Sequence, residues 1–360
     1  MADLDGRSDR GPLVSRRIVL DADPMALYEL SLREGWGDGL PLLPPTEQRV
    51  RSLLDAAHLD PDRSVATLPP SNAAATAELI AVNAALAGVE PAAFGHVVAA
   101  VRALADPALN LLGVAATTSS AAPALIVNGP SRRRLGFDHE GSCLGGAAGR
   151  ASSTVGRAVQ LCLRNIGGQR PDVTTKSVFG QPARVSGLCF GEWEERSPWP
   201  SLAERHGYPA SQDVVSAHVT KGLHAFADGN TIDEHDLVTL IARTLAVPLS
   251  NAFHGPAERG QTMLLINPVW ASRFGRTFPD VADFCRALHD RAWLPLDAWP
   301  PPGRQLLESK GRVGPRDRVW MHASPEQFLP VVCGGLGGLH AIALPTWGDS
   351  RLSAAAVRAG

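Results

Sequence analysis

The sequence predicts an α/β fold in which a central mixed sheet is covered by helices, with a helical segment at the N-terminus. Stretches with apolar residues at helical spacing alternate with short apolar runs over most of the 360 residues. Such alternation is typical of a sheet packed between helices. Apolar residues make up 44% of the chain and charged residues 19%, which is ordinary for a folded protein with a sizeable core.

The N-terminal half is expected to be mostly helical. Pro91 occupies the first position of its predicted helix, where a missing N–H costs little. The last of these helices has apolar residues on one face and stops at a Gly-Gly pair. Before it, residues 109–130 hold two apolar runs that predict strands around a Thr/Ser-rich middle. The predicted helices cover residues 24–36, 46–57, 76–88, 91–106 and 151–166.

The C-terminal half is expected to alternate between strands and helices. Acidic residues in the first turn of segment 233–247 favour a helix there, because they complement the helix dipole. The predicted strands are 184–195, 213–223, 262–268 and two runs separated by a glycine turn within 325–348. The predicted helices are 233–247 and 279–291.

The chain is predicted to divide into three parts. Residues 1–23 form a flexible lead-in, residues 24–294 the main α/β domain, and residues 295–360 a C-terminal α/β portion packed on it. The segment PLDAWPPPG at 295–303 is the best candidate for a linker. The lead-in is polar and lacks the apolar stretch of a signal peptide, so a cytoplasmic location is expected.

Composition argues against several classes of function. The 34 basic and 36 acidic residues give a formal net charge of −2, so nucleic acid is not an expected partner. No apolar run reaches the roughly 20 residues that span a bilayer, and no membrane association is expected. The five cysteines lack a Cys-x-x-Cys pair and are interpreted as thiols. No dinucleotide or P-loop glycine pattern occurs, so no cofactor is predicted.

Seven segments between about residues 24 and 350 carry a family resemblance. They are EGWGDGLPLLPPTEQRV, AVNAALAG, GVAATTSSAAPALIVNGP, GRASSTVGRAVQLCLRNIGG, GQPARVSGLCFGEWEERSPW, VTKGLHAFADG and VVCGGLGGLHAIALPTWG. In this order they resemble the large domain of the bacterial proteins associated with the UGSC-motif (seleno)protein family. The resemblance implies a grouping and no particular reaction.

The chain also departs from that family's pattern. The selenocysteine segment itself is absent, and the Glu-Gly-Ser-Cys at 140–143 does not stand in its usual setting. Ser152 stands where the family tends to have Asn, and Val89 where it tends to have Cys. These departures weaken any redox role taken from the resemblance and suggest a substrate of its own.

The segment LGGAAGRASST (144–154) predicts an anion site. A glycine-rich turn runs into a helix whose first N–H groups have no helical partner and carry the positive end of the dipole. Arg150 at the entrance could grip a carboxylate or phosphate. The alternative is a capped helix after a flexible turn. The candidate substrate-binding residues here are Gly145, Gly146, Arg150, Ser152, Ser153 and Arg157.

Cys143, just ahead of this helix, is the candidate nucleophile. A thiol near a helix N-terminus and an arginine is expected to have a lowered pKa and therefore more of the reactive thiolate. His139 is close in sequence and could transfer protons. The alternative is a small buried residue in a tight loop. The other four cysteines are interpreted as packing.

His224 and His340 are further acid–base candidates. Each lies where a strand meets a loop, and ligands of α/β sheets bind at strand ends. Thr117 and Asn128 could hydrogen-bond a substrate or cap strand ends. No metal is predicted, although a divalent ion remains compatible with ligands assembled in space from scattered histidines. That set is His139, His218, His224, His254 and His340.

The leading hypothesis is an enzyme acting on a small anionic molecule, held by the glycine-rich helix start and Arg150. Cys143 or a histidine would be its nucleophile or acid–base group, and a lyase, hydrolase or transferase is favoured over an NAD-dependent oxidoreductase. One alternative is a non-catalytic binding or partner subunit. Another is a thiol redox protein, which requires either a second cysteine within about 7 Å between Cα atoms or an exchange partner in another chain. The nearest cysteine in sequence is Cys162, on a helix face. A homo-oligomer is compatible with each.

Overall fold

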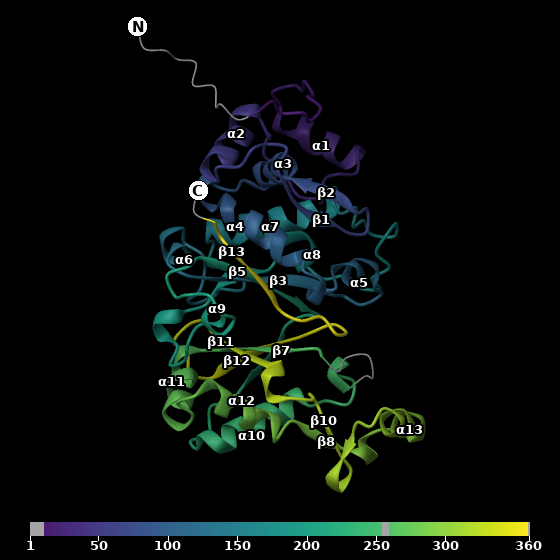
Figure 1. Ribbon diagram of the computed structural model, residues 1–360, viewed down its shortest axis with the longest axis vertical. Coiled ribbons are helices and arrows are strands. Elements are labelled where there is room, and N and C mark those ends of the chain that lie inside the picture. The colour runs from purple at the N-terminus through teal and green to yellow at the C-terminus, as the bar shows by residue number, and fades with distance from the viewer. Residues whose placement is uncertain (1–10, 254–258, 359–360) are drawn as a thin grey trace.

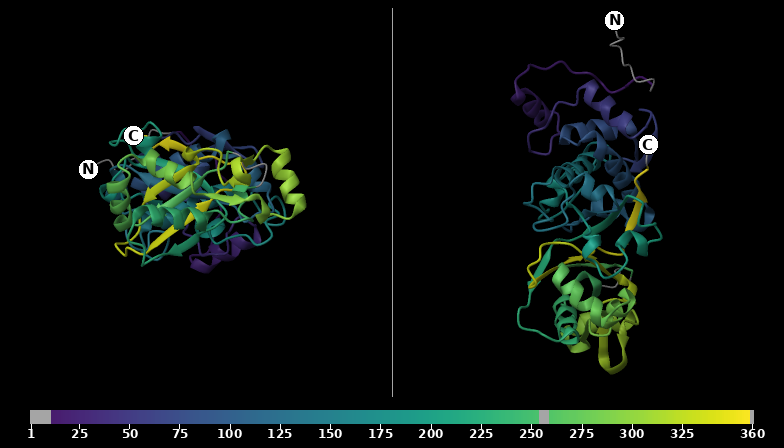
Figure 2. Two further views of the ribbon diagram at one scale, coloured as in Figure 1. Left: turned by 90° about the horizontal axis from the view of Figure 1, so that it is seen from below. Right: turned by 90° about the vertical axis from the view of Figure 1, so that its left-hand side faces the viewer.

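The computed structural model describes residues 11–253 and 259–358 and is a stack of layers along its long axis (Figure 1). Two four-stranded sheets lie at the centre, and helices cover the outer side of each (Figure 2). The predicted α/β class is confirmed, with the strands divided between two mixed sheets.

The first sheet has the strand order β13-β5-β3-β4. Strand β3 pairs parallel with β4 and antiparallel with β5, and β13 pairs antiparallel with β5. Its strands are β3 (Ala122–Asn128), β4 (Cys189–Gly191), β5 (Val214–Thr220) and β13 (Ser353–Ala356). The helices on its outer side are α3 (Ala77–Ala87), α4 (Phe94–Leu104) and α7 (Arg150–Asn165).

The second sheet has the order β11-β7-β12-β6, with β11 and β7 parallel and the other pairs antiparallel. Its strands are β6 (His224–Ala227), β7 (Thr262–Ile266), β11 (Phe328–Val332) and β12 (His340–Pro345). Its covering helices are α10 (Glu234–Leu245), α11 (Pro268–Thr277) and α12 (Val281–His289).

Smaller elements complete the two ends of the molecule. At the N-terminal end these are α1 (Pro24–Arg33), α2 (Glu47–Ala56) and a hairpin of β1 (Ser64–Leu68) and β2 (Ala73–Thr76). At the opposite end they are β8 (Trp293–Pro295), α13 (Pro301–Ser309), β9 (Val313–Gly314) and β10 (Arg318–Trp320). Short helices in connections are α5 (Leu111–Ala116), α6 (Ser131–Arg134), α8 (Ala183–Ser186) and α9 (Leu202–Arg205). Within residues 11–253 and 259–358, no helix is both long and apolar enough to cross a membrane.

Central strands are buried on both faces because helices cover one face of each sheet and the other sheet covers the opposite face. On β3, Leu125 and Val127 face the helices, while Ala124 and Ile126 face the second sheet. The residues of β7 alternate in the same way between the two cores, and Met263 lies on the side that faces the first sheet. Alternate residues of one strand therefore enter two different cores, which explains the continuous apolar runs.

Three predicted segments differ from the structure. The first run of 109–130 is a helix, α5, because the Asn110 side chain accepts the N–H of Gly113 and caps it. Segment 184–195 contains only the short strand β4, preceded by α8 and by Gly187 at φ +73°. The linker candidate 295–303 holds the end of β8, a 3-10 turn and the start of α13.

The chain crosses between the two sheets twice, from β5 to β6 and from β12 to β13. The boundary predicted between residues 294 and 295 falls inside β8, and the final strand, β13, returns to the first sheet. The second sheet is thus built from one continuous part of the sequence, and the first sheet from the residues before it together with the final strand.

Gly187 is expected to be intolerant of alanine. It has φ +73°, and a Cβ there would overlap backbone atoms of Gly156 in α7. We expect Gly187→Ala to lower the free energy of unfolding by more than about 3 kcal/mol, because neither backbone can yield cheaply. Gly180 is a matched control: it has φ +64° but open space around it, so Gly180→Ala should cost only about 1 kcal/mol. Urea unfolding followed by circular dichroism measures both, and equal losses would contradict the explanation.

Candidate functional site

Two glycine-rich loops meet where strands of both sheets end. One loop, residues 135–149, leads from α6 to α7, and the other, residues 333–339, joins β11 to β12. The N–H of Gly334 donates to the carbonyl of His139 at 2.9 Å. A Cβ on Gly335 would lie 3.4 Å from the Cα of Gly141, an ordinary van der Waals distance, so the two loop backbones are close neighbours.

The ends of the two sheets are joined beside these loops. The N–H of Trp193, just after β4, donates to the carbonyl of Val332 at the end of β11, at 2.6 Å. The N–H of Gly191 donates to the carbonyl of Asp138 at 2.7 Å. The loop that carries Asp138 is thereby fixed to β4, and β4 to the second sheet.

The loops bring Cys143 and Cys333 together. Both residues are about 5% exposed and belong to the core between the sheets, and their side chains hydrogen-bond to each other. Both are free thiols. The leading interpretation of Cys333 from sequence was packing within a strand; the structure places it one residue after β11, beside the candidate nucleophile. The sequence did offer one signal for pairing them, because each cysteine stands before a glycine pair in a loop. The two patterns are Cys-Leu-Gly-Gly at 143–146 and Cys-Gly-Gly at 333–335.

The contact makes the two thiols unequal. The hydrogen bond with Cys333 holds the pKa of Cys143 below its ordinary value, helped by a backbone hydrogen bond from Gly334, although burial and Asp138 act in the opposite direction. The same contact, together with burial, raises the pKa of Cys333. The arrangement therefore favours a thiolate on Cys143 and a protonated thiol on Cys333.

The remaining cysteines agree with their interpretation as packing residues. Burial raises the pKa of Cys285 to about 12. It raises the pKa of Cys162 and Cys189 as well. All three are buried and serve as internal controls for thiol reactivity.

His139 lies on the same loop as Cys143. Its Nδ1 is 2.7 Å from the carbonyl oxygen of Phe137, its Nε2 is 3.8 Å from Glu140, and its ring meets the edge of Trp193. Because a carbonyl oxygen can only accept, Nδ1 is the nitrogen that donates in the Phe137 contact. His139 thus supports the loop through its ring and its carbonyl.

The start of α7 is already occupied by the chain itself, which argues against the predicted anion site. The Asp138 carboxylate lies against Gly149, where a Cβ would overlap it. An external anion at this helix start would meet that carboxylate. The hydroxyl of Ser152, which is buried, accepts the N–H of Asp138 at 2.8 Å.

Arg150 is directed to a partner outside the loop. Its guanidinium donates to Glu90 at 2.5 Å and to the carbonyl of Gly88. Arg157 likewise pairs with Asp38 at 2.8 Å, so it holds the N-terminal segment instead of a ligand. Gly145 and Gly146 are exposed, with φ of +148° and +99°, and Ser153 is exposed on α7.

A buried polar network lies at the end of β3 and was not predicted. Asn128 donates to Glu192 at 2.7 Å and to Glu194 at 2.9 Å, and Glu192 also accepts the N–H of Leu202. Burial raises the pKa of Glu192. The negative charge of Glu192 in turn contributes to raising the pKa of Cys333. Asn128 is therefore a structural partner, and Glu192 acts on Cys333 as Asp138 acts on Cys143.

The other sequence candidates do not join this site. Thr117 ends α5 and accepts the N–H of Ser119. His224 and His340 begin β6 and β12, and because these strands are antiparallel the two residues lie at opposite ends of the pair. His218 is buried on β5 and bonds to the carbonyl of Leu344 across the sheets. His254 lies outside the described residues. Among the residues that are described, no three His, Cys, Asp or Glu side chains form a group able to hold a metal ion.

No protein-family model matches the chain, and no curated protein matches it. The resemblance to the UGSC-motif family therefore stays a prediction, and the function has to be argued from the site alone.

Proposed function

We propose that the protein is a thiol redox protein whose working centre is the pair Cys143 and Cys333. The observation that carries this proposal is the hydrogen bond between two thiols from loops far apart in sequence. A redox role for Cys143 requires a neighbouring cysteine, and the fold supplies one. The asymmetry of the two pKa values adds an attacking thiolate and a resolving thiol.

The proposed reaction is exchange with a small disulfide. The Cys143 thiolate attacks one substrate sulfur, the substrate S–S bond breaks, and one substrate thiolate leaves and takes up a proton. Cys333 then loses its proton and attacks the Cys143 sulfur, which releases the second substrate thiol and forms the Cys143–Cys333 bond. Two electrons pass from the protein dithiol to the substrate, and excess small thiol reverses the exchange.

Burial restricts the substrate to small molecules. Both cysteines are about 5% exposed, and the adjoining residues Ser142 and Gly145 are exposed. The loop on which Cys143 lies is thus the short route from solvent to sulfur. A protein disulfide would require the loops to open, whereas a low-molecular-weight disulfide requires much less movement.

The geometry supports the two other hypotheses less well. An enzyme for a small anion would rely on Arg150 and the start of α7, and these already contact Glu90 and Asp138. A pure binding protein needs no hydrogen-bonded thiol pair beneath two close loops.

Oxidation of the folded protein tests the proposal. We expect bis(2-hydroxyethyl) disulfide to produce one linkage, between the peptides that contain Cys143 and Cys333, with the loss of two hydrogens. Non-reducing peptide mass spectrometry detects it. Cys162, Cys189 and Cys285 should remain alkylatable after unfolding, and Cys143→Ser should abolish the linkage. Full recovery of all five thiols after oxidant treatment would overturn the proposal.

A further inference from the structure

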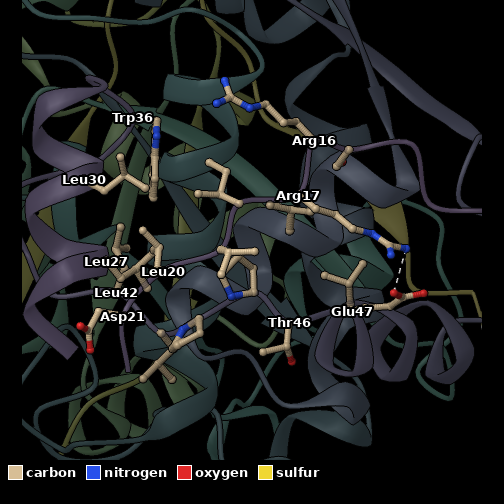
Figure 3. Close-up of a pocket in the computed structure, with 18 of the residues that line it drawn as sticks. Arg16, Arg17, Leu20, Asp21, Leu27, Leu30, Trp36, Leu42, Thr46 and Glu47 are labelled. Atoms are coloured by element: carbon tan, nitrogen blue, oxygen red, sulfur yellow. Dashed lines mark ion pairs between the residues drawn. The ribbon is translucent and has the colours of Figure 1, made fainter. Parts of the chain in front are cut away.

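A large cavity, shown in Figure 3, is lined by residues of the N-terminal part of the chain, between Leu13 and Val82, and by neither cysteine of the thiol pair. Its volume is about 770 Å³, within the range of about 300–1,000 Å³ that is common for small-molecule sites. Leu27 and Leu30 of α1, Trp36, Leu42 and Val50 of α2 form apolar walls. In Figure 3 the first four of these side chains gather on one side of the cavity.

The chain itself forms the cover of this cavity. Residues 13–23 cross it without helix or strand. The N–H groups of Val14 and Ser15 donate to the buried carboxylate of Glu78 at 2.9 and 2.7 Å, which fixes one end of the segment. Arg17 pairs with Glu47 of α2 at 2.9 Å, which is a second attachment of the segment. We call this segment, residues 13–23, the strap. It is attached to the rest of the chain at few points and lies over the cavity.

One buried polar atom identifies where a ligand could be held. The hydroxyl oxygen of Ser15, beside the strap's attachment to Glu78, is buried and has no hydrogen-bond partner within the described part of the chain. Such a group costs free energy unless something binds it. It can accept one hydrogen bond and donate another.

Charge around the cavity favours an uncharged occupant. Glu78 is already satisfied by two backbone N–H groups, and Arg17 by Glu47. The remaining charged residues of the lining carry both signs, as Arg16 and Asp21 do. The strap also exposes Ile18 and Val19, by 48% and 98%, so the approach to the cavity is apolar. An ion would lose hydration here without gaining a dedicated partner.

We propose that this cavity binds an uncharged, largely apolar small molecule that carries one hydrogen-bonding group, with Ser15 as its polar contact. The strap adds its own residues to the lining of the space, which suits a small ligand better than a flat partner surface. The proposal is independent of the thiol chemistry, since it concerns different residues at a different end of the fold.

N-phenyl-1-naphthylamine, an uncharged aromatic fluorophore with one N–H group, is a suitable probe. We expect saturable binding at one site per chain. Val82 of α3 lines the cavity, and Val82→Trp should fill it and abolish the fluorescence gain. Leu112→Trp is the matched control, because Leu112 is 56% exposed on α5 outside the cavity; it should leave probe binding unchanged.

Ser15→Ala provides a second and milder test. It removes the hydroxyl from an irregular segment, so folding should survive, and affinity should fall about fivefold, the order expected for one hydrogen bond. Unchanged affinity in this variant, or undiminished binding in folded Val82→Trp, would contradict the proposal. A stable dimer by light scattering that takes up no probe would also overturn it, because the cavity would then be an interface between two copies.

Discussion

Replacement of Cys333 by alanine is expected to slow the alkylation of Cys143 by about tenfold at neutral pH. The hydrogen bond with Cys333 is the largest influence that lowers the pKa of Cys143, and burial and Asp138 oppose it. Without that donor, the two opposing influences remain and the thiolate fraction falls. A hydrogen bond to a charged group is worth about 1.5–3 kcal/mol, which corresponds to a change of this order. The measurement is the rate of iodoacetamide labelling of Cys143 against pH, by peptide mapping.

Cys333→Ser separates the two roles proposed for Cys333. A serine hydroxyl still donates a hydrogen bond, so Cys143 should keep much of its reactivity, yet no intramolecular disulfide can form. Cys285→Ala removes a buried thiol elsewhere and should change neither property. If Cys143 reacts equally fast in folded wild type and Cys333→Ala, the activation of one thiol by the other is refuted.

Local periodicity predicted the helices well. Helix α3 spans 77–87 against a predicted 76–88, and α7 spans 150–165 against 151–166, because each has a capped start or a glycine stop within its own sequence. Helix α5 was mistaken for a strand because its cap, Asn110, precedes a run of only six residues. The division into two sheets follows from pairings between distant strands, such as β13 with β5, and these leave no local signal.

The site was predicted in part. Cys143 was singled out for its glycine-rich surroundings and its place before α7, and the structure keeps both features. The lowering of its pKa is caused chiefly by Cys333, however, and not by Arg150, whose guanidinium contacts Glu90. Sequence spacing could reveal neither contact, because both partners are brought in by the fold from other segments.

Acidification below pH 6.5 is expected to remove most of the protein's free energy of unfolding. Three histidines are buried, one against each apolar layer: His96 beside Phe137, His218 between the sheets, and His322 beside Phe328. Burial lowers their pKa values to about 4, about 4 and about 3. Asp213 partly offsets the effect at His96, and Arg312 adds to it at His322.

The sign follows from proton binding. At least about one pH unit above the unfolded pKa of 6.5, these rings are neutral in both the folded and unfolded chain, so their contribution is constant. Between about pH 6.5 and 4 the unfolded chain binds more protons, and stability falls with pH. The differences of about 2.5–3.5 pKa units amount to about 3–5 kcal/mol for each ring, and together to the order of a typical total stability of about 5–15 kcal/mol. The raised pKa of Glu192 acts in the opposite direction and offsets part of the loss.

The decisive range is pH 5 to 6.5, because ordinary carboxylates hardly titrate there while unfolded histidines do. Urea unfolding followed by circular dichroism should show a constant free energy from pH 8 to 7 and a steepening loss below 6.5. His218→Gln keeps a side-chain donor for the carbonyl of Leu344 but cannot be protonated, so it should remove about one third of the slope in this range. A free energy of unfolding that stays level from pH 7 to 5 would show that these rings gain protons without unfolding, and that the layers around them admit water.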